Sequence, residues 1–364
     1  MNEQLPPILA FNPKLFERIW GGQKLSDVCG VAHPGHIPVG EAWLVSDHPQ
    51  HVSVVDGGPC DGRTLRDLLS NHTNQLLGLR AELTIHGRFP LLFKLLDAAD
   101  YLSVQVHPDD HDAKRLNEPD VGKTEMWHVL EAAQDSELIC GMLPGSDPTN
   151  LADAIHAGTV EEHLSNFPAE SGTTVFVPAG TFHAIGKNIL LAEIQQNSDI
   201  TYRVYDWRRL QPDGQPRELH IEKALEVTHF GNQRTAASIP LDIEHPSGKQ
   251  TILGACKYFA AERFKIEGDY TRATRGDSFH LLLGITGHLE VHCGDAVREL
   301  STGNALMIPG ERESYSVHGA GEYLAYYVPD LQRDIIAPLT QAGHPSSSIA
   351  DLGEISLHLK PSEN

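Results

Sequence analysis

The sequence contains few cysteines, and no stretch of it is apolar over more than a few residues. Its five cysteines are scattered along 364 residues, and none belongs to a Cys-x-x-Cys pair. Such dispersed thiols argue against a disulfide framework and against thiolate-bound zinc, and they are typical of a reducing compartment. Apolar runs such as 281–283 are far too short to span a bilayer. Residues 1–11 lack the basic and apolar regions of a signal peptide, so we expect a cytoplasmic protein.

Basic residues are also scarce. Lys and Arg number 28 against 49 Asp and Glu, which gives a formal net charge of -21. No basic block offsets this charge, so we expect neither a nucleic-acid nor a membrane partner. An anionic small-molecule substrate would need a locally positive pocket, and the charge itself is explained by a solvated acidic surface. The sequence leaves the oligomeric state open between a monomer and a weak homo-oligomer.

Glycine and proline are plentiful, at 32 and 23 residues, and they separate short β-branched and aromatic runs. This punctuation predicts a mainly β protein built from two barrels. In the first barrel we expect strands at 42–46, 102–106, 126–130, 173–177 and 189–194. In the second we expect strands at 258–264, 279–285, 288–292 and 305–308.

Helical periodicity is confined to the first part of the chain, where it predicts helices at about 64–77, 109–117 and 150–167. Residues 232–249 are rich in proline, serine and glycine, so we place a boundary there between domains 1–235 and 250–364. Gly303-x5-Pro309 in the second domain repeats the spacing of Gly172-x5-Pro178 in the first, but no histidine follows it. We therefore expect two related barrels, of which only the first binds metal.

Three segments of the first barrel carry a candidate metal-binding set. In Ser-Val-Gln105-Val-His107, strand alternation places the amide and the imidazole on one face. Glu125 follows in Gly-Lys-Thr-Glu, and His183 follows the turn Pro-Ala-Gly. Two imidazoles, a carboxylate and an amide oxygen suit a redox-inert divalent ion such as zinc. Any one of these residues alone is better explained as a satisfied polar group.

Several charged residues surround this set. Lys123 lies two residues before Glu125, so alternation brings it to the same face. Glu193 is awkward to bury within the apolar run 189–194, so its face lines a wet cavity or Glu193 pairs with a cation. Lys94 poses the same question, and we expect its side chain to extend along the strand edge to solvent.

The motifs together resemble one enzyme family. The runs PLLFKLLD (90–97), LSVQVHPDD (102–110), GKTE (122–125) and VPAGTFHA (177–184) are similar to those of type I phosphomannose isomerases of the short bacterial form. ERIWGG (17–22), GEAWLVS (40–46) and NSDITYRVYD (197–206) resemble further segments of that family. The likeness is dense over about 11–225 and thin beyond. It implies two cupin-type jelly-roll barrels, although the generic cupin H-x-H motif has a glutamine, Gln105, at its first position here.

The resemblance also implies an activity and a set of roles. It implies a zinc-dependent interconversion of mannose 6-phosphate and fructose 6-phosphate, with one zinc ion held by Gln105, His107, Glu125 and His183. It assigns Arg203 as the catalytic arginine and places Ser103 and Lys123 at the substrate.

Aldose–ketose exchange through an enediol(ate) develops negative charge on oxygen, which Arg203 would stabilise while Lys123 adds positive potential. Glu193 and a metal-activated water are the two candidates for the proton-moving base. Two other functions stay open: an iron-dependent cupin dioxygenase, against which Gln105 argues, and a non-catalytic cupin that binds sugar phosphates.

Overall fold

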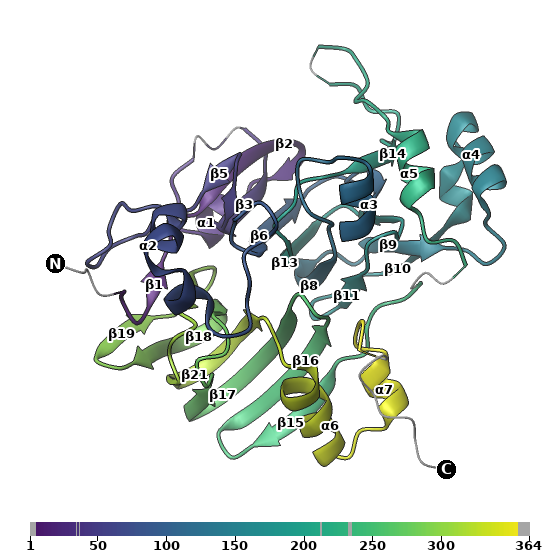
Figure 1. The fold of residues 1–364 in the computed structure, drawn as a ribbon. Coiled ribbons are helices and arrows are strands. Elements are labelled where there is room, and N and C mark those ends of the chain that lie inside the picture. Colours follow the sequence, from purple (N-terminus) through teal and green to yellow (C-terminus); the bar gives the residue numbers. More distant parts are fainter. Residues whose placement is uncertain (1–4, 34, 36, 212, 232–234, 356–364) are drawn as a thin grey trace.

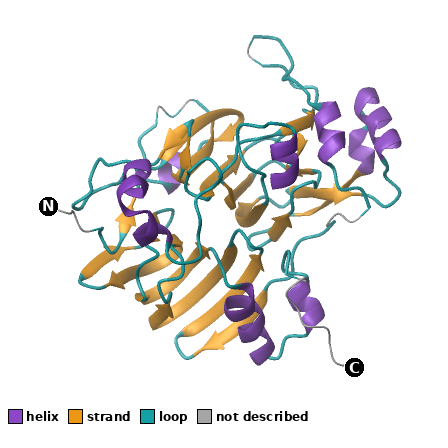
Figure 2. Ribbon diagram, in the orientation of Figure 1, coloured by secondary structure: helices purple, strands orange, loops and turns teal. Residues whose placement is uncertain are grey.

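A computed structural model of the chain describes residues 5–33, 35, 37–211, 213–231 and 235–355. Strands dominate it, and the helices lie at the periphery (Figure 2). The predicted mainly β class is confirmed. The strands form three large antiparallel sheets and a small ribbon, and the strand orders leave these sheets open rather than closed into complete barrels.

Two sheets in the first part of the chain pack against each other. One has the order β10 (Leu164–Pro168), β9 (Glu137–Met142), β12 (His183–Ile185), β7 (Val104–Val106) and β14 (Tyr202–Tyr205). The other has the order β11 (Thr174–Val177), β8 (Glu125–Ala132), β13 (Ile189–Gln196), β6 (Leu91–Ala98), β2 (Lys14–Gly22) and β3 (Val39–Val45). One apolar cluster joins the two sheets, with Trp127, Val129 and Leu191 from the second and Leu138 and Ile185 from the first. β4 (Asp47–His48) and β5 (His51–Val52) form the ribbon.

The third sheet contains most of the C-terminal part. Its order is β1 (Leu9–Ala10), β20 (Ala305–Ile308), β18 (His280–Cys293), β21 (Ser314–Tyr327), β17 (Ala260–Ala273), β16 (Gly248–Ala255) and β15 (Leu241–His245), with β19 (Ala296–Glu299) paired to β18. The first described strand, β1, therefore lies beside C-terminal strands in the last sheet (Figure 1). There Leu9 pairs with Met307. The division at 235 and 250 stays a prediction, and residues 232–234 lie outside the described part.

The two parts share one apolar core. Phe93 of the first part contacts Tyr326 of the second, with ring centroids 4.8 Å apart, and Phe89 meets Phe279 at 4.4 Å. All four rings are fully buried. Since burial of large aromatic side chains supplies much of the stabilisation of a core, we expect the two parts to be held firmly together.

Two of the three predicted helices match the structure closely. α2 (Leu65–Leu77) begins with a capping box between Thr64 and Asp67, and Gly78 follows its last residue. α3 (Asp110–Arg115) is capped by the Asp109 carboxylate. The remaining helices are α1 (Leu25–Val28), α5 (Ile221–Val227), α6 (Ala337–Gln341), α7 (Ser346–Ala350), a 3-10 turn at Val160–His163 and a π-helix at Leu331–Ile336.

Two expectations about element boundaries are wrong. The helix expected over 150–167 is only α4 (Pro148–Ala157), because Gly158 takes a left-handed conformation with φ 73° and residues 164–168 pair with β9 instead. The strands expected at 279–285 and 288–292 are one strand, β18, which continues through an irregularity in its pairing between Gly284 and Thr286. Among the described residues, no helix has the length and apolarity needed to cross a membrane.

Candidate metal centre and substrate cavity

The candidate residues come from strands that face each other across the first two sheets. β7 lies between β12 and β14, so Gln105 is paired with His183 on one side and with Arg203 on the other. His107 comes directly after β7, where Pro108 follows it. Glu125 opens β8 in the opposite sheet. Strand pairing and the packing of the two sheets therefore bring residues from three distant segments to one place.

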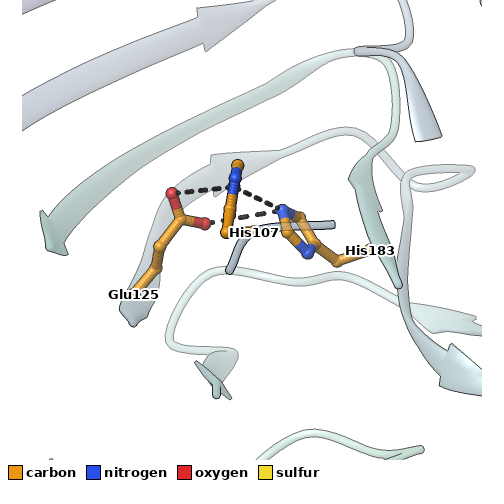
Figure 3. Close-up of side chains that lie close together, drawn as sticks. All are labelled: His107, Glu125 and His183. Atoms are coloured by element: carbon orange, nitrogen blue, oxygen red, sulfur yellow. Dashed lines mark hydrogen bonds and ion pairs between the residues drawn. The ribbon is translucent and has the colours of Figure 1, made fainter. Parts of the chain in front are cut away.

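His107, Glu125 and His183 point toward a common centre (Figure 3). The two Nε2 atoms lie 3.1 Å apart. The Glu125 oxygens lie 3.4 Å from His107 Nε2 and 3.6 Å from His183 Nε2. All three side chains are about 1% exposed. This is the geometry of two nitrogen donors and one carboxylate around a buried point.

The hydrogen bonds of the two Nδ1 atoms determine which nitrogen of each imidazole carries the proton. His107 Nδ1 lies 2.6 Å from the carbonyl oxygen of Ile200, and His183 Nδ1 lies 2.8 Å from that of Thr181. A carbonyl only accepts, so each Nδ1 carries the proton and each Nε2 presents a lone pair to the other. Two lone pairs 3.1 Å apart repel each other and so favour a cation nearby. The Lys123 ammonium lies 3.3 Å from His107 Nε2, and the point between the two nitrogens suits a metal ion.

Protonation states fit the same interpretation. Burial, and after it the Lys123 ammonium, lower the pKa of His107 to about 3. Burial also lowers the pKa of His183. Burial alone would raise the pKa of Glu125, but the Lys123 ammonium, 2.5 Å away, holds it well below its usual value. Two neutral imidazoles and an ionised carboxylate are the forms that bind a divalent metal.

Gln105 lies at the edge of this centre. Its side-chain nitrogen is 3.2 Å from His183 Nε2. Since the amide oxygen and nitrogen occupy equivalent positions, an amide rotated by half a turn would present the oxygen at the same place. The position of Gln105 thus suits a fourth ligand, and the ligand role stays a prediction.

The turn before His183 depends on a glycine. Gly180 has φ 78°, and a Cβ there would lie 2.6 Å from the His229 ring. Its N–H donates to the carbonyl oxygen of His107 at 2.8 Å. This bond joins the two histidine-bearing segments, so the turn sets the separation of the two imidazoles.

A cavity of about 330 Å³ opens beside the centre, a size typical of small-molecule sites. Ser103, Lys123, Glu193 and Arg203, all predicted as substrate or catalytic residues, line its wall together with Gln105 and His183. The Nε of Arg203 donates to the hydroxyl of Ser103 at 3.2 Å, and one terminal nitrogen donates to the carbonyl of Glu218 at 3.0 Å. Lys123 Nζ lies 2.5 Å from Glu125.

Glu193 satisfies both alternatives left open by the sequence, because it lines the cavity and also pairs with a cation. Its oxygens accept from the indole N–H of Trp127 at 2.9 Å and lie 3.2 Å from Lys94 Nζ. Burial, and after it the Glu125 carboxylate, raise the pKa of Glu193. The expectation that Lys94 reaches solvent is wrong: it is 4% exposed, because the pairing of β6 with β13 places it opposite Glu193.

Lys94 also lies near a second carboxylate, which was not expected from the sequence. Glu41 Oε2 lies 3.8 Å from Lys94 Nζ and accepts from Trp43 Nε1 at 2.7 Å, while Oε1 accepts from Arg18 at 2.7 Å. A charged residue, Glu41, within the otherwise uncharged strand β3 is the sequence feature that could have indicated a buried ion pair here. Arg217, Asp199 and Thr201 also line the cavity. Asp199 and Thr201 lie in the motif 197–206, but the sequence assigned none of the three a role.

More cations than carboxylates line the cavity wall of this strongly acidic protein, and two of these cations, Lys123 and Arg217, also pair with Glu125 and Asp206. Five cations and three carboxylates line it: Arg18, Lys94, Lys123, Arg203 and Arg217 against Glu41, Glu193 and Asp199. The low-dielectric walls strengthen the field of these charges. Such a cavity can receive an anionic ligand.

Comparison with known proteins gives a consistent result. Residues 8–172 match the family model "Phosphomannose isomerase type I, catalytic domain", and residues 249–328 match "Mannose-6-phosphate isomerase, cupin domain". The chain is 35% identical to the putative mannose-6-phosphate isomerase YvyI of Bacillus subtilis, over 84% of this chain and 94% of that protein. It is 34% identical to the mannose-6-phosphate isomerase of Streptococcus mutans, over 87% and 97% of the two chains.

The fold is also similar to those of solved structures with related names. The crystal structure of the mannose 6-phosphate isomerase from Bacillus subtilis superposes with a TM-score of 0.80 at 32% identity, covering 88% of this chain and 99% of that one. A putative mannosephosphate isomerase from Archaeoglobus fulgidus gives a TM-score of 0.69 at 21% identity, which shows the shared fold alone.

Proposed function

The chain belongs to the type I phosphomannose isomerases, and from this membership we propose that it interconverts mannose 6-phosphate and fructose 6-phosphate with the help of one bound zinc ion. One observation carries the proposal: two neutral imidazoles and a carboxylate converge beside a cavity that also presents Lys123, Arg203 and Glu193. A sugar phosphate is anionic and small, which suits the cation-rich wall and the volume of this cavity.

The proposed zinc ligands are His107, Glu125 and His183, with Gln105 as a fourth through its amide oxygen. The buried lone pairs of both histidines and the acidic Glu125 favour a divalent cation there, and nitrogen with oxygen donors suit zinc. When bound, zinc would polarise and orient the sugar oxygens.

The remaining residues move the proton and stabilise charge. The carboxylate of Glu193 takes the C2 proton of mannose 6-phosphate and returns it to C1, while a proton passes between the two sugar oxygens. Burial raises the pKa of Glu193 from its ordinary value, which makes it a stronger base than an exposed carboxylate. Arg203 stabilises the enediolate oxygen, and Ser103 holds the guanidinium and contacts substrate. Lys123 contributes positive potential for the substrate.

A coupled assay tests this proposal. Purified protein is incubated with mannose 6-phosphate, and fructose 6-phosphate formation is followed before chelation, after chelation and after zinc is restored. We expect turnover, its loss on chelation and its recovery with zinc. Turnover unaffected by chelation would refute the metal role. Binding of the substrate without turnover would favour a non-catalytic protein, and oxygen consumption restored by iron would favour a dioxygenase.

We also propose a cytoplasmic location. The five buried thiols, none of them in a disulfide, support it.

A further inference from the structure

The short segment 122–124 contains Lys123 and directly precedes Glu125, the first residue of β8. The segment itself therefore lies outside the strand. Two backbone contacts fix it: Lys123 N–H donates to the carbonyl of Pro108 at 3.0 Å, and Thr124 N–H donates to Gln196 Oε1 at 3.0 Å. A Cβ on Gly122 would lie 2.5 Å from the backbone of Asp109. The position of two site residues therefore depends on how this short segment is held.

The carboxylate of Asp110 connects these contacts. Its Oδ1 accepts from Gly122 N–H at 3.0 Å and from Gln196 Nε2 at 2.9 Å. Gln196 in turn accepts from Thr124, so Asp110 holds the segment both directly and through this amide. Hydrogen bonds to an ionised acceptor are stronger than neutral ones.

The second oxygen of Asp110 is bound by the C-terminal part of the chain. The hydroxyl of Tyr258 donates to Asp110 Oδ2 at 2.6 Å, across 148 residues of sequence. Both residues line a separate cavity of about 470 Å³, whose wall comes from both parts of the protein. The hydrogen bond from Tyr258 therefore links the C-terminal part of the chain to the Asp110 carboxylate, which also holds the segment 122–124.

We propose that Tyr258 and Asp110 are positioning residues, through which the C-terminal part fixes Lys123 and Glu125 at the metal centre. The inference rests on the proposed function in treating those two residues as working groups. It assigns the connection between β16 and β17 a part in shaping the site, although no described residue of the C-terminal part lines the cavity beside the metal centre.

The test uses the full-length chain with Tyr258→Phe, Asp110→Ala and the double variant. Tyr270→Phe is the matched control, because it also removes a hydroxyl from a partly buried tyrosine of the C-terminal part. Amide hydrogen exchange of 122–125 is measured on chelated protein, and zinc affinity is measured by competition with a chromophoric chelator. Asp110→Asn replaces Asp110→Ala should the alanine variant not fold.

We expect Tyr258→Phe to raise exchange in 122–125 and to weaken zinc binding about threefold to tenfold, less than the roughly 10- to 100-fold typical of groups that touch a ligand. Tyr258→Phe should have no further effect when Asp110 is already replaced, and Tyr270→Phe should leave both readouts unchanged. Lowered thermal stability without change in either readout, or effects that add in the double variant, would overturn the inference. Exchange does not require catalysis, so a protein without isomerase activity would refute the proposed function and leave this test intact.

Discussion

The buried pair between Lys94 and Glu193 allows a quantitative prediction. The two charges lie 3.2 Å apart, and Glu41 adds a second carboxylate 3.8 Å from the same ammonium. At an effective dielectric constant of about 20, these separations correspond to attractions of about 5 and 4 kcal/mol. The cost of removing all three charges from water offsets most of that attraction.

Replacing Lys94 by methionine keeps an unbranched side chain, one atom shorter, and removes the charge together with the N–H donors. Glu193 then retains one hydrogen bond, from Trp127, whereas Glu41 retains Arg18 and Trp43. An uncompensated buried carboxylate typically destabilises by about 3–5 kcal/mol. We therefore expect Lys94→Met to lower the free energy of unfolding by that amount, and Lys94→Met with Glu193→Gln to recover much of it.

Urea unfolding of chelated protein at pH 7 measures the effect, with Lys249→Met as the control. Lys249 also pairs with a carboxylate, Asp242 at 2.9 Å, but both side chains are more than 40% exposed. Its loss should cost less than about 1 kcal/mol. The reasoning fails if Lys94→Met costs no more than this control, or if the double variant is no more stable than the single one.

Three further predictions concern other parts of the molecule. Arg203→Ala should lower kcat about 100- to 1000-fold while the metal content stays unchanged; near-normal turnover in the steady-state assay would exclude the arginine role. Burial would raise the pKa of Asp120, but hydrogen bonds, that from His48 first, lower it to about 2 from 3.8. The resulting stabilisation, about 2 kcal/mol, is present above pH 3.8 and lost as the pH falls toward 2, so Asp120→Asn should flatten the pH dependence of unfolding in that interval. Gly78 has φ 83°, and a Cβ there would lie 2.7 Å from the backbone of Asp277, so Gly78→Ala should destabilise by about 1–3 kcal/mol in thermal or urea unfolding; an unchanged midpoint would contradict the assigned strain.

Local rules explain part of the centre of the site. Alternation along one strand relates Gln105 to His107, and a proline-glycine turn precedes His183, but the pairing of β7 with β12 and the position of β8 in the opposite sheet bring the three segments together. Helical periodicity similarly located α2, whose first turn is closed by a capping box between Thr64 and Asp67. These features depend on neighbours within a few residues, which the sequence displays directly.

Pairing between distant strands was beyond such rules. Whether Lys94 meets solvent or Glu193 is decided by the register of β6 against β13, which no local pattern specifies. The role of Glu41 depends in the same way on the register of β3. Residues 164–168 show a related limit, because their pairing with β9 overrides a weak helical periodicity. In each case, contacts between residues far apart in the sequence determine the observed structure.

The pairing of Leu9 with Met307 has a consequence for biosynthesis. At a translation rate of about 5–20 residues per second, roughly 15–60 seconds separate the emergence of these two partners from the ribosome. During that interval the first strand of the nascent chain has no sheet to join. Completion of the last sheet therefore awaits nearly the whole polypeptide, and fusions that tether the amino terminus should disturb the final stage of maturation.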